Sequence, residues 1–120
     1  MSRNAEIVFL DEDTCHLPPG HFWCEIFNGR HLSVDYTNKQ QVLCVEGTRD
    51  NNQPLYKWNK WVKTNDVISF PSILNNIEYP CFNCEFIGDK LIEVHMRHNP
   101  DFLGHNHSEI IPVWEGDDVT

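Results

Sequence analysis

The sequence is short of basic residues, with nine Lys and Arg against 18 Asp and Glu, which gives a formal net charge of −9. So few cations, scattered along the chain, make no basic stripe for a phosphate backbone, so we expect no nucleic-acid partner. Long apolar runs are also missing. No stretch approaches the roughly 18 apolar residues of a membrane span, and acids stand where a signal peptide carries its apolar region. These absences predict a soluble, cytoplasmic protein without a membrane partner.

Internal repeats and low-complexity linkers are absent as well, and 120 residues suit one compact domain. We therefore expect a single domain over residues 1–120, with an acidic tail at 115–120 that frays. The five cysteines are an odd number, and in a cytoplasmic chain we interpret them as reduced thiols.

Runs of β-branched, aromatic and alternating residues predict an α+β domain, mostly antiparallel sheet with one or two short helices. The first strands are expected over residues 5–10, 22–27, 30–36 and 41–46. Asn28-Gly29 is typical of a type I′ turn, and residues 37–40 predict a second turn. Proline at position 71 predicts a short helix over residues 72–77.

The most informative segment is residues 80–97, which alternates with period two on either side of Gly88. Its apolar sets are Phe82, Cys84 and Phe86 on the first strand and Ile92, Val94 and Met96 on the second. If both sets face one core, Phe86 lies opposite Ile92, which requires a three-residue loop over 88–90. The same register places Asn83 opposite His95, Glu85 opposite Glu93, and Cys81 opposite Arg97.

Two carboxylates, Glu85 and Glu93, thus face each other, an arrangement that destabilises an antiparallel pair. A cation between them would remove the repulsion, and the oxygen ligands suit magnesium carrying a phosphate, with Arg97 reaching the same anion. The alternative is a solvated polar face on which Glu85 pairs with Arg97 and Glu93 pairs with Lys90.

These residues resemble a known family. Residues 83–97, Asn-Cys-Glu-Phe-Ile-Gly-Asp-Lys-Leu-Ile-Glu-Val-His-Met-Arg, resemble the closing hairpin of ATP-grasp enzymes, in which acids and an arginine hold magnesium and nucleotide phosphates. Residues 23–35, Trp-Cys-Glu-Ile-Phe-Asn-Gly-Arg-His-Leu-Ser-Val-Asp, resemble the adenine-hinge hairpin of the same family. Both motifs occur in family order, and the resemblance is clearest over residues 23–101.

The resemblance implies a role for each matching residue. Glu85 and Glu93 match the metal-binding acids, and Arg97 matches the catalytic arginine near the transferring phosphate. His95 stands where the family usually has an asparagine, so it would bind a metal through nitrogen. Residues that would contact ATP as cofactor are Glu25 or the backbone at Ile26, at the adenine, and His31, in the place of the ribose-binding acid.

The chain resembles only the C-terminal subdomain of ATP-grasp carboxylate–amine ligases. The resemblance therefore implies a ligase-like, magnesium-dependent ATP-binding half-site without turnover of its own. Such a chain would be a fragment, a degenerate stand-alone module, or one half of a site that another chain completes.

Two other interpretations remain. Cys81, Cys84, His95 and His98 have the spacing of a zinc site, although on strands their side chains would point to opposite faces. The second interpretation is a non-catalytic binding or scaffold module. In such a module, an exposed apolar cluster of Tyr56, Trp58 and Trp61 would support a homo-oligomer. The lysines between these rings would also suit stacking of a base, against the simpler role of covering a small core.

Overall fold

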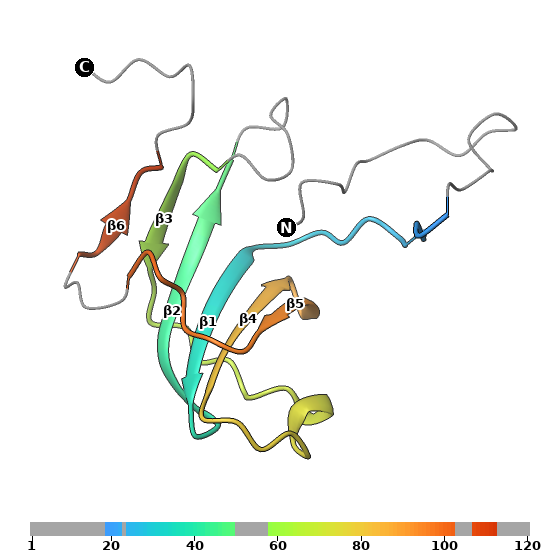
Figure 1. The fold of residues 1–120 in the computed structure, drawn as a ribbon. Helices are drawn as coiled ribbons and strands as arrows, with labels where there is room; N and C mark the ends of the chain where they lie inside the picture. Colours follow the sequence, from blue (N-terminus) through green and yellow to red (C-terminus); the bar gives the residue numbers. More distant parts are fainter. Residues whose placement is uncertain (1–18, 23, 50–57, 103–106, 113–120) are drawn as a thin grey trace, which may run out of the picture.

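The computed structural model describes residues 19–22, 24–49, 58–102 and 107–112. They form one antiparallel sheet of six strands in the order β5-β4-β1-β2-β3-β6 (Figure 1). The strands are β1 (His31–Thr37), β2 (Gln40–Thr48), β3 (Lys60–Lys63), β4 (Cys81–Ile87), β5 (Lys90–His95) and β6 (Glu109–Ile110). The antiparallel sheet is as predicted. Helical structure in the described ranges is a single 3-10 turn, η1 (Ser72–Leu74), shorter than the expected helix.

The expected strand at residues 5–10, the acidic tail at 115–120 and Tyr56 lie outside the described residues. Within the part that the structure describes, no helix has the length and apolar character to cross a membrane.

β1 is a central strand that pairs with β2 on one side and β4 on the other. The β1–β2 turn is made by Asn38 and Lys39, with φ of 49° and 66°, so both take the positive φ of a type I′ turn. The hairpin predicted around Asn28-Gly29 is wrong, because residues 24–28 form no strand. Gly29 instead lies against Gly88, and a Cβ at Gly29 would stand 2.7 Å from the Gly88 Cα. Glycine is needed there for a close backbone approach.

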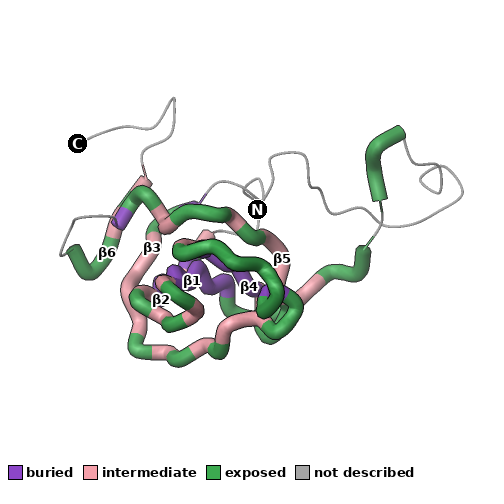
Figure 2. Tube along the Cα trace, turned by 60° about the horizontal axis from the view of Figure 1, so that its bottom comes forward, coloured by how far each residue is buried: buried purple, intermediate pink, exposed green. Residues whose placement is uncertain are grey.

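The two faces of the sheet differ in polarity because side chains alternate along each strand. One face carries the core: Leu32, Val34, Tyr36, Cys44, Leu74, Phe82, Cys84 and Phe86. The chain between β3 and β4 covers this face, where Ile68 and Phe70 pack and the Tyr36 hydroxyl donates to the Ile68 carbonyl at 2.8 Å. Figure 2 shows the buried positions concentrated along β1 and β4. The opposite face of the same strands is polar.

The β4–β5 register agrees with the sequence prediction in the part of the hairpin away from the turn. Glu85 lies opposite Glu93 and Asn83 opposite His95. The three-residue loop is wrong: the turn is shorter, Phe86 pairs with Leu91, and a bulge leaves Ile92 as the extra residue of β5. The bulge restores the facing that a two-residue turn would otherwise invert.

β5 does not supply the second apolar set that the period-two pattern predicted. Val94 is 38% exposed and Met96 is 50% exposed, because β5 is an edge strand. The strand also ends at His95, so Cys81 and Arg97 are not a cross-strand pair.

The chain then crosses the polar face of the sheet, because β5 and β6 lie at opposite edges (Figure 1). We call residues 96–102 the crossing segment. Its Asn99 backbone N–H donates to Asp35 Oδ1 of β1 at 2.9 Å, and Phe102 is buried beside β3, with the Lys63 ammonium 5.7 Å from its ring centroid. The crossing segment therefore covers part of the polar face.

Candidate functional site

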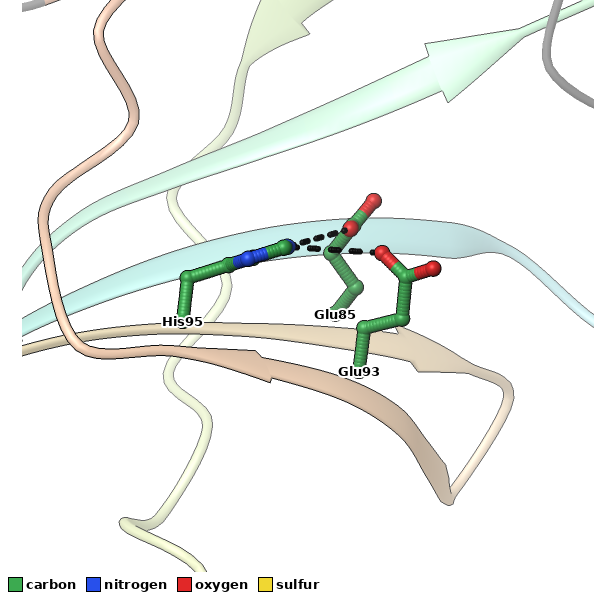
Figure 3. Close-up of side chains that lie close together, drawn as sticks. All are labelled: Glu85, Glu93 and His95. Carbon is green, nitrogen blue, oxygen red and sulfur yellow. Dashed lines mark ion pairs between the residues drawn. The ribbon is translucent and has the colours of Figure 1, made fainter. Parts of the chain in front are cut away.

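Glu85, Glu93 and His95 meet on the polar face, the first from β4 and the other two from β5 (Figure 3). His95 Nε2 lies 3.5 Å from Glu85 Oε2 and 3.4 Å from Glu93 Oε2. One potential ligand atom from each residue lies within 4.8 Å of the other two. Two oxygens and one imidazole nitrogen at this spacing are a donor set that can hold a divalent cation.

The two carboxyl groups of this cluster titrate in opposite directions. Burial favours a raised pKa for Glu85, but hydrogen bonds with His31 and Glu93 outweigh burial and hold that pKa well below its ordinary range. The hydrogen bond to Glu85, together with burial, raises the pKa of Glu93. Glu85 is thus the more acidic of the two and Glu93 the less acidic, as expected for two acids that share one site.

His31 of β1 is a buried hydrogen-bond partner of Glu85. Its Nε2 lies 3.0 Å from Glu85 Oε1, and only 6% of the residue is exposed. The ring packs edge-on against Trp58 and Trp61, with centroids 4.3 Å and 5.5 Å away. A buried histidine in this position orients the carboxylate.

Trp58 and Trp61 do not form the exposed cluster that was expected to support an oligomer. Trp58 is 9% exposed, and both rings lie over Gly47 of β2. A Cβ at Gly47 would meet both indoles at 2.8–2.9 Å, so glycine makes room for them. The indoles pack on the site, and the exposed-aromatic argument for self-association no longer applies.

A cleft of about 510 Å³ opens on this face beside the cluster. Its lining includes Glu85, His95 and Arg97, so the structure brings these three predicted residues together. Glu25 and Ile26 are exposed in the chain before β1 and do not line the cleft. The residues expected at the adenine are therefore not brought to the cluster of Glu85, Glu93 and His95, and His31, expected at the ribose, contacts Glu85.

A polar network beside the cluster escaped the sequence analysis. The Asn83 side chain donates from Nδ2 to Ser33 Oγ at 2.8 Å and to Asp35 Oδ1 at 2.9 Å. All three residues are 4% exposed. The available signal was alternation: His31, Ser33 and Asp35 are polar at every second position of one strand, as are Asn83 and Glu85 of another. The sequence did not predict that β1 pairs with β4, which brings these two polar rows together.

The ligands proposed for zinc do not converge. Cys84 is fully buried in the core, on the face opposite to His95, while His98 Nε2 lies 3.0 Å from the Thr37 hydroxyl. The pairings of the solvated-face alternative are also not formed, since in the described part of the chain neither Arg97 nor Lys90 makes an ion pair with the two acids.

Comparisons with protein-family models, with curated proteins and with solved structures gave no match for this chain. The case for function therefore comes from the geometry of the site.

Proposed function

We propose that this domain is a magnesium-nucleotide half-site of the ATP-grasp type, in which Glu85, Glu93 and His95 hold the divalent cation. The observation that supports it is the convergence of these three side chains within 4.8 Å on the polar face. The two acids are paired across β4 and β5 and share one site with His95, so a divalent cation can take the place of the proton that lies between them.

Arg97 gives this site its anion-binding component. Arg97 is an exposed residue that lines the same cleft as Glu85 and His95, and its guanidinium donates to the His98 carbonyl at 3.2 Å. A guanidinium beside a metal ion favours a phosphate that contacts both. The nitrogen ligand from His95 also suits manganese, so we expect manganese to bind at least as well as magnesium.

Electron paramagnetic resonance of Mn²⁺ tests the site directly, since bound ion loses the sharp signal of free ion. We expect one Mn²⁺ per chain, displaced by excess Mg²⁺, and at least tenfold weaker binding in Glu93→Gln. Glu78→Gln, at an acid whose side chain is 90% exposed, is the matched control and should bind as the wild type does. Equal affinity in all three proteins would remove the proposal.

The half-site proposal also limits activity. Phosphoryl transfer needs positive charge on both sides of the transferring group, and the cleft lining contributes one guanidinium, that of Arg97. We expect magnesium-ATP to bind weakly and more weakly still in Arg97→Gln, with no phosphate release from the chain alone. Magnesium-dependent release that disappears in Glu93→Gln would mean that a complete site forms without a partner.

A further inference from the structure

The cleft contains polar groups that the metal cluster does not use. The Asn83 side-chain amide donates both of its Nδ2 protons, one to Ser33 Oγ and one to Asp35 Oδ1. Because one of these acceptors is a carboxylate, the amide orientation is fixed and Oδ1 is the atom left over. In the described residues this oxygen has no hydrogen-bond partner, although Asn83 lines the cleft and is 4% exposed. A buried acceptor without a donor costs free energy, so its position calls for a ligand.

Two donor groups that line the same cleft as Asn83 also have no acceptor among the described residues. Ser33 Oγ accepts from Asn83, and its own proton has no acceptor among the described residues. Asn99 accepts from the Asp101 N–H through Oδ1, which leaves its Nδ2 protons unused in the same part of the structure. Both residues line the cleft. The shared partner Asp35 holds Asn83 and Asn99 together, at 2.9 Å each.

We propose that this cleft binds the primary carboxamide of a small organic ligand. Its carbonyl oxygen accepts from Ser33 and Asn99, and its N–H donates to Asn83 Oδ1. A primary amide presents its oxygen and one N–H on the same edge, whereas a trans peptide bond presents them on opposite edges. The apolar body of the ligand packs on Trp61, Ile110 and Pro112, half-buried side chains that line the same cleft.

Charged alternatives fit the cleft less well. A carboxylate would place a negative charge beside Glu85 and Asp35, both buried, and would present no donor to Asn83. An ammonium group has only donors and would leave Ser33 and Asn99 without an acceptor. The polar group formed by Ser33, Asn83 and Asn99 therefore favours a neutral ligand group that both accepts and donates, whereas the anion proposed above would be held by the cation and Arg97. The cleft volume of about 510 Å³ is within the usual range for small-ligand sites.

The test uses benzamide as probe, with benzoate as an isosteric control and benzylamine and benzyl alcohol as controls that lack the carbonyl, and the readout is the ¹H–¹⁵N correlation spectrum of the full chain. We expect benzamide to shift the Trp61 indole and Asn83 side-chain signals saturably, with a millimolar Kd at least fivefold tighter than that of any control. No saturable shift, or a control that binds as tightly as benzamide, would overturn the proposal.

Variants locate the contact. Ser33→Ala, which removes only the hydroxyl, should weaken benzamide binding at least fivefold, and so should Asn99→Ala. Ser69→Ala, at an exposed serine on the opposite side of the sheet, should leave it unchanged. Unchanged affinity in a folded Asn99→Ala protein would count against the proposal even if Ser33→Ala does not fold. Benzamide binding should persist with EDTA and in Glu93→Gln, so this result and the metal result are independent.

Discussion

At the scale of single residues, Gly47 determines whether the indoles of Trp58 and Trp61 can pack on the polar face of the sheet. The residue lies on β2 opposite Trp61 of β3, and its missing side chain leaves the space that two indoles fill. Those indoles in turn enclose His31, which fixes the Glu85 carboxylate. The absence of a side chain at Gly47 thus affects the position of Glu85 through the packing of the two indoles on His31.

Gly47→Ala should therefore destabilise the fold by about 1–3 kcal/mol, as overpacking does. The new methyl would lie within 3 Å of both indole rings, so at least one ring has to move. Urea denaturation and tryptophan emission check this together. Gly20→Ala is a control for the emission spectrum alone: no atom lies within 4 Å of the added methyl, but a φ of 82° strains alanine. This variant should therefore lose some stability and leave the emission spectrum unchanged. Unaltered stability and emission in Gly47→Ala would mean that the indoles are not packed over this position.

The cysteines give a second prediction at this scale. Burial raises the pKa of the Cys84 thiol to about 11, so at pH 8 it stays protonated and out of reach of reagents. Cys24 is exposed. Iodoacetamide at pH 8 should alkylate Cys24 in the native protein and leave Cys84 unmodified until urea is added, as peptide mass mapping will show. Comparable native rates at the two thiols would contradict the described core.

At the scale of elements, a buried carboxylate is one of the anchors of the crossing segment. Asp35 Oδ1 accepts from the backbone of Asn99 and from the side chain of Asn83, so it joins β1, β4 and the crossing segment. His98 is a second anchor, because its Nε2 lies 3.0 Å from the Thr37 hydroxyl. Hydrogen bonds to a charged group are stronger than neutral ones, so we expect Asp35 to be the stronger of these two anchors.

Asp35→Ala should cost about 3 kcal/mol, because it removes two such bonds and leaves buried donors without an acceptor. The loss should be local as well as global. Amide hydrogen exchange at Asn99 should speed up relative to the core amides of β1. Asp101→Ala, at an exposed position of the same segment, should preserve the protection of Asn99. Equal protection in both variants would assign the anchoring to another contact.

The sequence predicted some of these elements and missed others for identifiable reasons. The pairing of Glu85 with Glu93 was predictable from the local alternating pattern, although a two-residue turn and a bulge at Ile92 produce it in place of the three-residue loop that was predicted. The turn at Asn28-Gly29 was misassigned, since a close backbone approach to Gly88 selects glycine as strongly as a type I′ turn does. The β1–β4 pairing joins residues such as Ser33 and Asn83, which lie 50 positions apart. No local pattern reports such a contact, so the polar network stayed hidden.

At the scale of the whole molecule, the metal site should link stability to pH. The raised pKa of Glu93 means that this group keeps its proton to a higher pH than an ordinary glutamate, and a metal ion has to displace that proton. Affinity for Mn²⁺ should therefore fall as the pH is lowered from 7.5 to 5.

The measurement is the unfolding free energy with and without metal. An ion at ten times its Kd stabilises the folded chain by about 1.4 kcal/mol, and this increment should become smaller as the pH is lowered from 7.5 to 5. In Glu93→Gln the increment should be small at both pH values. A metal effect independent of pH in the wild type would place the ion elsewhere.

The strand order has a kinetic consequence. The β1–β2 hairpin, closed by Asn38 and Lys39, is local and can form within microseconds. Pairing of β4 with β1 requires closure of a long loop, which makes it slow. The crossing segment is bound through Asn99 to Asp35, and Asp35 meets Asn83 only once that pairing exists. We therefore expect the cleft to be assembled late in folding, after the rate-limiting step. A molecule bound there should lengthen the lifetime of the folded chain and leave its rate of formation unchanged.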